Sequence, residues 1–129
     1  MKVLNLIIKQ KYFDAILSGR KVQEFREVRP TTVKKLLQLD KEGFEVVDDN
    51  QNAQPIKDDA IRFYVGYNKD RDSALVEVKS AYCEIFVDEN NEPIEYMYNN
   101  QLWVSEQVVF NLGKILETNI KEQSKRVRI

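Results

Sequence analysis

"KVLNLIIKQKYFDAILSGRKVQEFREV", residues 2–28, contains the change of pattern on which the predicted fold depends. Residues 2–9 place apolar side chains on both faces of a strand, which predicts a strand buried on much of both sides, near the centre of a sheet. In residues 10–19 the apolar spacing becomes helical, and Gly19 can take the left-handed conformation that ends a helix. Residues 21–28 then predict a second strand. The chain is therefore expected to open with a strand, a short helix and another strand.

Beyond this opening, the pattern predicts one more helix and then mostly strands. Residues 30–43 begin with a proline, repeat apolar side chains at helical spacing and end with a glycine, so we expect a second helix there. Residues 44–59 are polar and predict a long loop that has room for a short hairpin arm. Residues 60–67 alternate as a strand does. Residues 94–104 fit a strand or an exposed hairpin, and residues 108–117 favour a strand with a kink.

The apolar alternation of residues 74–87 shifts by one position at Ser80. The apolar set is Ala74, Val76 and Val78 before the shift and Ala81, Cys83, Ile85 and Val87 after it. A strand with such a shift requires a bulge or a sharp bend. Bends of this kind curl a sheet toward a barrel. With a length that suits one domain over residues 1–129, these patterns predict a single domain of the α+β class.

The composition limits the kinds of function that are possible. The chain has 20 basic and 21 acidic residues, for a net charge of -1, so any site for a polyanion must be a local patch. One cysteine and no histidine exclude disulfides within the chain, the usual zinc sites and every mechanism that uses imidazole. We expect no metal and no cofactor. The apolar run at the N-terminus is too short for a signal peptide or a membrane span, which favours a cytoplasmic protein without membrane contact.

The strand after Gly19 carries charges where an ordinary strand alternates apolar and polar residues. The charged residues considered for a site are Lys21, Glu24, Arg26 and Arg29, with Lys9, Lys11 and Arg20 near them in sequence. An arginine held by a neighbouring glutamate is oriented for phosphate or a base edge, and a lysine beside it adds a point charge or a base. The alternative is a solvated edge strand with cross-strand ion pairs.

Aromatic residues provide a second candidate feature. Those proposed for stacking on unpaired bases are Tyr64, Tyr67, Tyr82, Tyr96, Tyr98 and Trp103. Packing at the rim of the core is the alternative for the same residues. Tyr12 is instead assigned to the apolar face of the first helix, with Phe13 and Ile16. The basic residues of the C-terminal tail either contact RNA or are simply solvated.

The segment "ILSG" followed by "RKVQEFRE" resembles the ASCH domain family. The family signature is a glycine, a lysine two residues later, and a glutamate and an arginine on the next strand, matched here by Gly19, Lys21, Glu24 and Arg26. "VVFNLGKILE" is similar to the closing strand of the family. The resemblance implies a PUA-like β barrel of about five to six strands, flanked by two or three short helices, with a cleft lined by the motif residues. It also implies binding of RNA or a nucleotide, as in bacterial and phage-encoded members.

Some small members of the family hydrolyse N4-acetylcytidine. They use the motif lysine as base, a threonine three residues after it as nucleophile, and a distant glutamate as proton donor. Here Lys21 matches the lysine and Glu24 stands at the nucleophile position. A carboxylate there would act as general base toward water, with Lys21 or Arg26 stabilising the oxyanion and Glu77 or Glu84 as the distant acid.

Three hypotheses follow from these residues. The leading one is a binding module for RNA or a nucleotide, whose site consists of Lys9, Lys21, Glu24, Arg26 and Arg29. The alternative is a small amidohydrolase that acts on N4-acylated cytidine or a related acylated nucleoside, with Lys21 and Glu24 as catalytic residues. The third is an interaction protein whose charged strand docks a partner. An enzyme needs a closed pocket around Lys21, whereas a binding module needs an open basic groove that extends past it.

Overall fold

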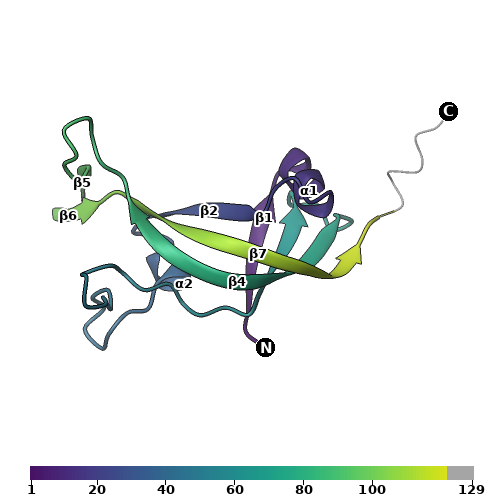
Figure 1. The fold of residues 1–129 in the computed structure, drawn as a ribbon, viewed down its shortest axis with the longest axis horizontal. Coiled ribbons are helices and arrows are strands. Elements are labelled where there is room, and N and C mark those ends of the chain that lie inside the picture. Colours follow the sequence, from purple (N-terminus) through teal and green to yellow (C-terminus); the bar gives the residue numbers. More distant parts are fainter. Residues whose placement is uncertain (122–129) are drawn as a thin grey trace. The chain divides into compact units, whose positions relative to one another are not determined.

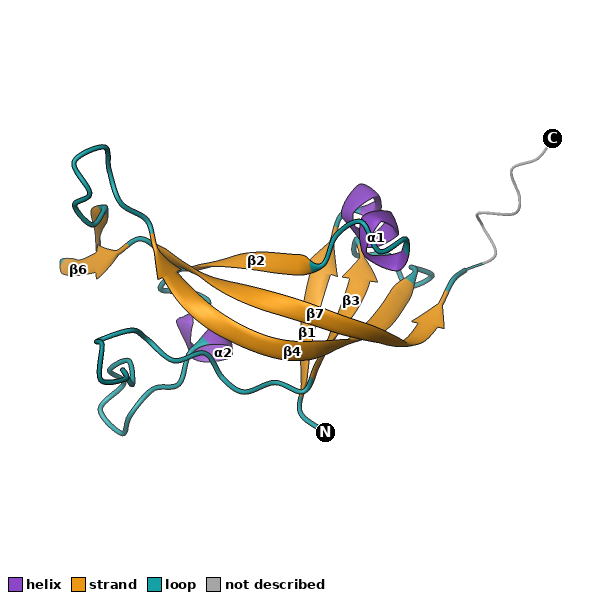
Figure 2. Cartoon of the chain, viewed as in Figure 1, coloured by secondary structure: helices purple, strands orange, loops and turns teal. Residues whose placement is uncertain are grey.

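The computed structural model describes residues 1–121 of the 129-residue chain. Residues 122–129, which hold most of the basic tail, lie outside the described residues. Within the described part, two short helices and seven strands form an α+β fold that is mostly β, as Figures 1 and 2 show. The predicted fold class is therefore confirmed.

The described chain divides into two compact units, each assembled from separate segments. The first unit contains Met1–Gln23, Asp58–Lys79 and the chain from Asn111 onward. The second unit contains Glu24–Lys57 and Ser80–Phe110. Two long strands, β4 (Ser73–Ile85) and β7 (Glu106–Asn119), contribute to both units. We describe each unit by itself.

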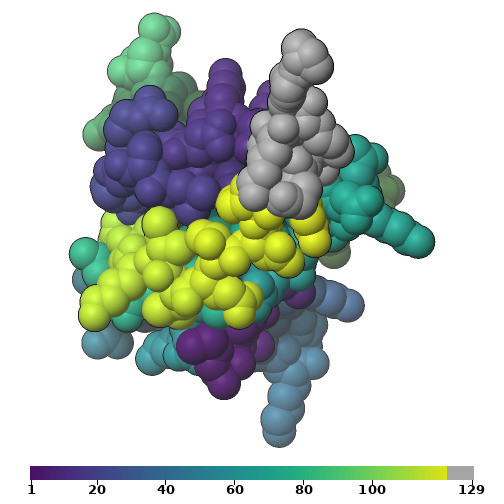
Figure 3. Space-filling model, turned by 90° about the vertical axis from the view of Figure 1, so that its right-hand side faces the viewer, coloured from purple at the N-terminus to yellow at the C-terminus, as the bar shows by residue number. Residues whose placement is uncertain are grey.

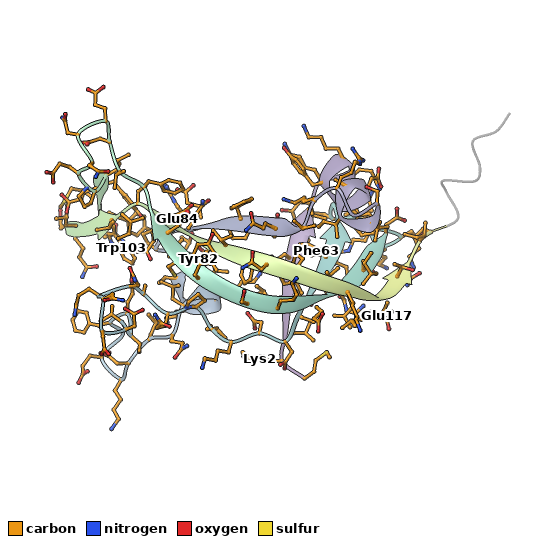
Figure 4. The ribbon with its side chains drawn as sticks, viewed as in Figure 1. Lys2, Phe63, Tyr82, Glu84, Trp103 and Glu117 are labelled. Carbon is orange, nitrogen blue, oxygen red and sulfur yellow. The ribbon has the colours of Figure 1, made fainter. Side chains whose placement is uncertain are left out.

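The first unit contains β1, α1, β3 and parts of β4 and β7. Strand β1 (Val3–Ile8) pairs in parallel with β3 (Ala60–Val65), which pairs antiparallel with β4. Helix α1 (Gln10–Leu17) buries Phe13 and Ile16. The core of this unit consists of Leu4, Leu6, Ile8, Phe13, Ile16, Ala60, Ile61, Phe63, Ala74, Val76 and Leu112, among which Phe63 is labelled in Figure 4.

Strand β1 is an edge strand, so its predicted place at the sheet centre is wrong. The order of the sheet is β1-β3-β4-β7-β2, with β1 at one end. Leu4, Leu6 and Ile8 are buried, but Val3 on the opposite face is exposed and Ile7 is only half-buried. The apolar residues on both faces suggested two covered sides, whereas only one face of β1 is buried.

The second unit contains β2 (Gln23–Val28) from its second residue on, α2 (Val33–Leu36), the β5-β6 hairpin and the remaining parts of β4 and β7. Its core consists of Val28, Val33, Leu36, Leu37, Ala53, Val108, Val109 and Phe110. These residues come from the charged strand, the second helix, the loop after it and β7.

The second helix has four residues instead of the predicted fourteen-residue span 30–43. From Leu37 the backbone is extended and forms isolated bridges, Leu37 with Pro55, Leu39 with Glu45 and Val47 with Ala53. The carboxylate of Asp40 accepts the N–H groups of Glu42 and Phe44, which fixes a turn where the helix was expected to continue. The polar loop thus contains the predicted hairpin arm. The residues from Leu37 onward pair with this arm instead of continuing the helix.

The predicted barrel does not close in the part of the chain that the structure describes. The five-stranded mixed sheet ends at β1 on one side and at β2 on the other, and β5 pairs only with β6. A closed barrel would need hydrogen bonds between β1 and β2, which no strand pairing provides. The less exposed side chains of β4 do change phase near Ser80, from the buried Ala74 and Val76 to the half-buried Ala81 and Cys83, although Ile85 of the predicted set is exposed.

A tight turn joins β5 (Glu95–Tyr98) to β6 (Gln101–Val104). Asn99 and Asn100 have φ values of 49° and 63°. Two consecutive residues in the left-handed region form the type I′ turn that matches the twist of a two-residue hairpin. The sequence of residues 94–104 fits a strand or an exposed hairpin, and the hairpin is what forms.

We expect Asn100→Ala to lower the free energy of unfolding by about 1 kcal/mol, because alanine is strained at positive φ and asparagine much less so. Asn100→Gly is the matched control and should unfold at the same or a higher urea concentration than wild type. Urea denaturation of the three proteins measures this. An equal loss in both variants would mean that the asparagine side chain, and not the backbone conformation, stabilises the turn.

Candidate functional site

A glycine turn at the end of α1 positions Lys21. Gly19 has a φ of 82°, and its N–H donates to the carbonyl oxygen of Ile16 at 3.1 Å. The N–H of Lys21 then donates to the carbonyl oxygen of Ala15 at 3.0 Å, one turn back along α1. A residue with a Cβ is disfavoured at this φ, which is why glycine is needed here. The chain reverses at Gly19, and Lys21 lies beside the helix.

This reversal brings Lys21 to Tyr12. The ammonium nitrogen of Lys21 lies 5.6 Å from the centroid of the Tyr12 ring, and that of Lys11 lies 5.0 Å from the same centroid. Both distances fall within the range of about 6 Å in which a cation is attracted to an aromatic face. Tyr12 is 44% exposed, not buried as the assignment to the apolar helix face predicted. We call Lys11, Tyr12 and Lys21 the lysine–tyrosine cluster.

The segment around the lysine–tyrosine cluster is basic. Lys9 precedes α1, and Arg20 follows it with its Nε donating to Ser18 Oγ at 3.0 Å. Between Lys9 and Lys21 there are four basic residues and one acidic residue, Asp14, which accepts a hydrogen bond from Gln10. A local excess of positive charge of this kind attracts anions even though the net charge of the chain is -1.

A cavity of about 260 Å³ lies beside the same turn in the first unit. Its lining residues are Ile16, Leu17, Ser18, Gly19, Lys21, Val22, Val76, Leu112, Gly113 and Ile115. Figure 3 shows the yellow surface of β7 next to the purple surface of the N-terminal segment on this unit. The lining is mostly apolar, and Lys21 is its one ionisable residue. The cavity therefore offers a lysine without a carboxylate among its lining residues.

In the second unit, the carboxylate of Glu24 holds the guanidinium of Arg26. Glu24 Oε2 accepts hydrogen bonds from Arg26 Nε at 3.0 Å and from Nη2 at 2.5 Å. Glu24 is only 6% exposed, so its charge is buried next to its partner. The predicted orientation of an arginine by a neighbouring glutamate is confirmed. A guanidinium fixed in this way is suited to recognising a planar anion or a base edge.

The other charged pair of this strand is exposed. Arg29 Nη1 lies 2.6 Å from Glu27 Oε1, and the hydrogen bond and the charge of Glu27 raise the pKa of Arg29 above its ordinary value. The guanidinium carbon of Arg29 also lies 5.2 Å from the centroid of the Tyr96 ring. Successive strand residues point to opposite faces, so the pair of Glu24 and Arg26 and the pair that involves Glu27 use different faces. Ion pairs thus account for the broken alternation.

The five predicted binding residues are divided between the two units. Lys9 and Lys21 are in the first unit, one before α1 and one after it. Glu24, Arg26 and Arg29 are in the second unit, where the structure pairs Glu24 with Arg26. The predicted catalytic residues Lys21 and Glu24 therefore belong to different units.

The two candidates for a distant acid already accept hydrogen bonds. Glu77 Oε1 accepts the backbone N–H of Lys114 at 3.1 Å in the first unit. Glu84 Oε1 accepts from Gln107 Nε2 at 2.7 Å in the second unit. Among residues 1–121 no group of three or more histidine, cysteine, aspartate or glutamate side chains is arranged to hold a metal ion. No helix in this range is long and apolar enough to cross a membrane.

Tyr12 is the functional candidate that the sequence pattern missed. Of the six aromatic residues proposed for stacking, Tyr64 lies under Arg71, with 4.3 Å between the guanidinium carbon and the ring centroid. Tyr96 and Trp103 are opposite each other in the β5-β6 hairpin. The sequence did contain a signal for the exposure of Tyr12, because a lysine lies next to it and another follows the glycine turn.

No protein-family model, curated protein or solved structure matches this chain.

We expect Arg26→Ala to lower the free energy of unfolding by about 2 kcal/mol, because it removes two hydrogen bonds from a buried carboxylate. Arg29→Ala is the matched control and should cost much less, since its pair with Glu27 is about half exposed on both sides. Urea denaturation of both variants at one pH measures the difference. Similar losses in the two variants would contradict the claim that burial separates the two pairs.

Proposed function

We propose that the first unit binds single-stranded RNA or a nucleotide at the lysine–tyrosine cluster. The observation that carries this proposal is the exposed ring of Tyr12 with two ammonium groups near it, 5.0 Å and 5.6 Å from its centroid. An unpaired base stacks on an exposed aromatic ring, whatever its sequence. The two lysines are then close enough to the stacked base to contact its flanking phosphates.

The surrounding charge and the family resemblance support the same proposal. Lys9 and Arg20 extend the positive surface along the strand before and the turn after α1. Gly19 and Lys21 are also the positions at which the chain resembles the ASCH signature. We therefore propose an ASCH module, with RNA, a nucleotide or a modified nucleoside as its partner.

In the second unit, Glu24, Arg26 and Arg29 are proposed as further contacts for the same class of ligand. Glu24 fixes the guanidinium plane of Arg26, which favours bidentate hydrogen bonds to phosphate or to a base edge. Arg29 lies over Tyr96, and an arginine on an aromatic ring is a common neighbour of a stacked base. This part of the proposal rests on the chemistry of these pairs alone.

Hydrolysis of an acylated nucleoside is the second candidate, because Lys21 lines a cavity of about 260 Å³. In that reaction, water activated by a carboxylate attacks the acyl carbon, and the amine leaves with a proton. No residue that lines the cavity is a carboxylate, and the carboxylate of Glu77, which lies against Gly113 of the lining, already accepts the backbone N–H of Lys114. Binding needs no such group, and for this reason we favour binding over hydrolysis.

We expect Tyr12→Ala to weaken binding of a fluorescent single-stranded RNA by about tenfold, the typical value of one base–aromatic stack. Lys11→Ala and Lys21→Ala should each lower the slope of log K against log salt concentration by about 0.7. Lys69→Ala is the matched control from the same unit, exposed and outside the cluster, and should bind like wild type. Fluorescence anisotropy over a salt series measures all four variants.

Two results would count against the binding module. Equal affinity of wild type, Tyr12→Ala and Lys21→Ala would remove the lysine–tyrosine cluster from the account. Release of acetate from N4-acetylcytidine by wild type, measured by mass spectrometry and lost in Lys21→Ala, would favour the hydrolase instead.

A further inference from the structure

The second unit contains a hollow of about 600 Å³, and the proposed RNA or nucleotide site does not use it. One wall comes from the arm after α2 and the other from β6 and the start of β7. The lining residues are Val33, Leu39, Glu42, Gly43, Phe44, Glu45, Gln101, Leu102, Trp103, Val104 and Glu106. Its volume lies within the range of about 300–1,000 Å³ that is usual for ligand sites. We call it the acidic hollow, because its only charged lining residues are three glutamates.

Two residues that line the acidic hollow carry buried polar atoms without a partner. Glu106 is only 7% exposed, and its Oε1 has no hydrogen-bond partner among the described residues. The indole N–H of Trp103, which is labelled in Figure 4, also has no partner in this part of the chain. The hydroxyl of Tyr96, opposite Trp103 in the hairpin, is also buried and has no hydrogen-bond partner among the described residues. Such atoms are costly to bury and are usually satisfied by another group.

The electrostatics of the acidic hollow favour a cation. Burial and then the charge of Glu45 raise the pKa of Glu106 to about 7, and burial also raises the pKa of Glu45. Glu42 adds a third carboxyl group, and no basic residue is among the lining residues. The other titratable groups that interact with Glu106 are the thiol of Cys83 on β4 and the phenol of Tyr96 on β5.

These neighbours do not neutralise Glu106. Burial, followed by the charges of Glu106 and Glu45, raises the pKa of Cys83 to about 12, so this thiol stays neutral. Arg29 lies over the ring of Tyr96 and is hydrogen-bonded to Glu27, and no basic residue is among the lining residues of the hollow. A ligand that carries positive charge would therefore supply what the protein does not.

The aromatic residues that line the acidic hollow favour a guanidinium over an ammonium group. Phe44 is 70% exposed, and Trp103, three residues before Glu106, lines the same hollow. A guanidinium is planar, stacks on aromatic faces and donates two parallel hydrogen bonds to one carboxylate. An ammonium group is a more strongly hydrated point charge that lacks this planar fork.

We propose that the acidic hollow binds a guanidinium group, which donates to Glu106 and Glu45 and stacks on Trp103 or Phe44. The group comes either from a small free molecule or from an arginine residue of a peptide. A peptide also brings a backbone carbonyl, which can accept the N–H of Trp103, whereas a small guanidine without an acceptor cannot. This inference concerns the second unit and does not depend on the RNA proposal.

Isothermal titration calorimetry of the whole chain at pH 8 tests the proposal, with agmatine and N-acetyl-argininamide as probes and cadaverine as the ammonium comparison. Both guanidines should bind more tightly than cadaverine. Glu106→Gln, which keeps the shape and removes the charge, should weaken binding by about tenfold or more. Glu89→Gln, an exposed carboxylate outside the hollow, is the matched control and should bind like wild type.

Wild-type protein alone provides a second test that does not depend on a variant. Glu106 becomes ionised as the pH rises through about 7, so affinity for agmatine should increase from pH 6 to pH 8. At pH 7 the cation should displace a proton from Glu106, and the measured heat should differ between two buffers with different ionisation enthalpies.

The outcomes distinguish a small free guanidine from an arginine of a peptide, and they also show whether the proposal fails. Equal affinity for the two guanidines supports a small free molecule. Tighter binding of N-acetyl-argininamide, reduced by Trp103→Phe alone, supports an arginine of a peptide. No binding of either guanidine at pH 8, or unchanged binding in a folded Glu106→Gln protein, overturns the proposal.

Discussion

The left-handed turn at Gly19 is the constraint on which the candidate site of the first unit depends. Because Gly19 has a φ of 82°, the N–H of Lys21 can donate to the carbonyl oxygen of Ala15 and the chain returns along α1. The side chain of Lys21 then lies near Tyr12 and beside the cavity of about 260 Å³. One backbone conformation, available mainly to glycine, thus converts neighbours in sequence into a cationic and aromatic surface.

Glu24 and Glu106 show how partners decide the behaviour of equally buried carboxylates in the second unit. They are 6% and 7% exposed. Glu24 has the guanidinium of Arg26 at hydrogen-bond distance, and it contributes to a local ion pair. Glu106 has the carboxyl of Glu45 as its charged neighbour, and burial, followed by the charge of Glu45, raises its pKa to about 7. The first arrangement stabilises the strand that carries it, and the second leaves a charge that a ligand can satisfy.

The local elements could be predicted from the sequence, because their signals are local. The helical spacing and the glycine after it predicted α1, and the β-branched residues at the start of segment 108–117, with Gly113 at its centre, favoured the strand that β7 forms. The length of the second helix could not be predicted, since Asp40 fixes a turn and the backbone from Leu37 finds partners on a distant arm. The same holds for the edge position of β1 and the open sheet, which depend on which strands pair and not on any one strand.

The candidate sites were predictable to different degrees. The pairing of Glu24 with Arg26 follows from their two-residue spacing on a strand. The exposure of Tyr12 does not follow from its spacing, because it lies at the border of the buried helix face that Phe13 defines. The acidic hollow was invisible in the sequence, since its walls come from segments about sixty residues apart that only the folded unit brings together.

Photocrosslinking tests the central claim, that the lysine–tyrosine cluster is the binding surface, most directly. A single-stranded RNA that contains 4-thiouridine would be irradiated with the whole protein, and the crosslinked peptides would be identified by mass spectrometry. The account predicts that the main crosslink maps to the peptide of α1 that contains Tyr12 and disappears in Tyr12→Ala. Saturable RNA binding with crosslinks only to residues outside Lys9–Lys21 would contradict it.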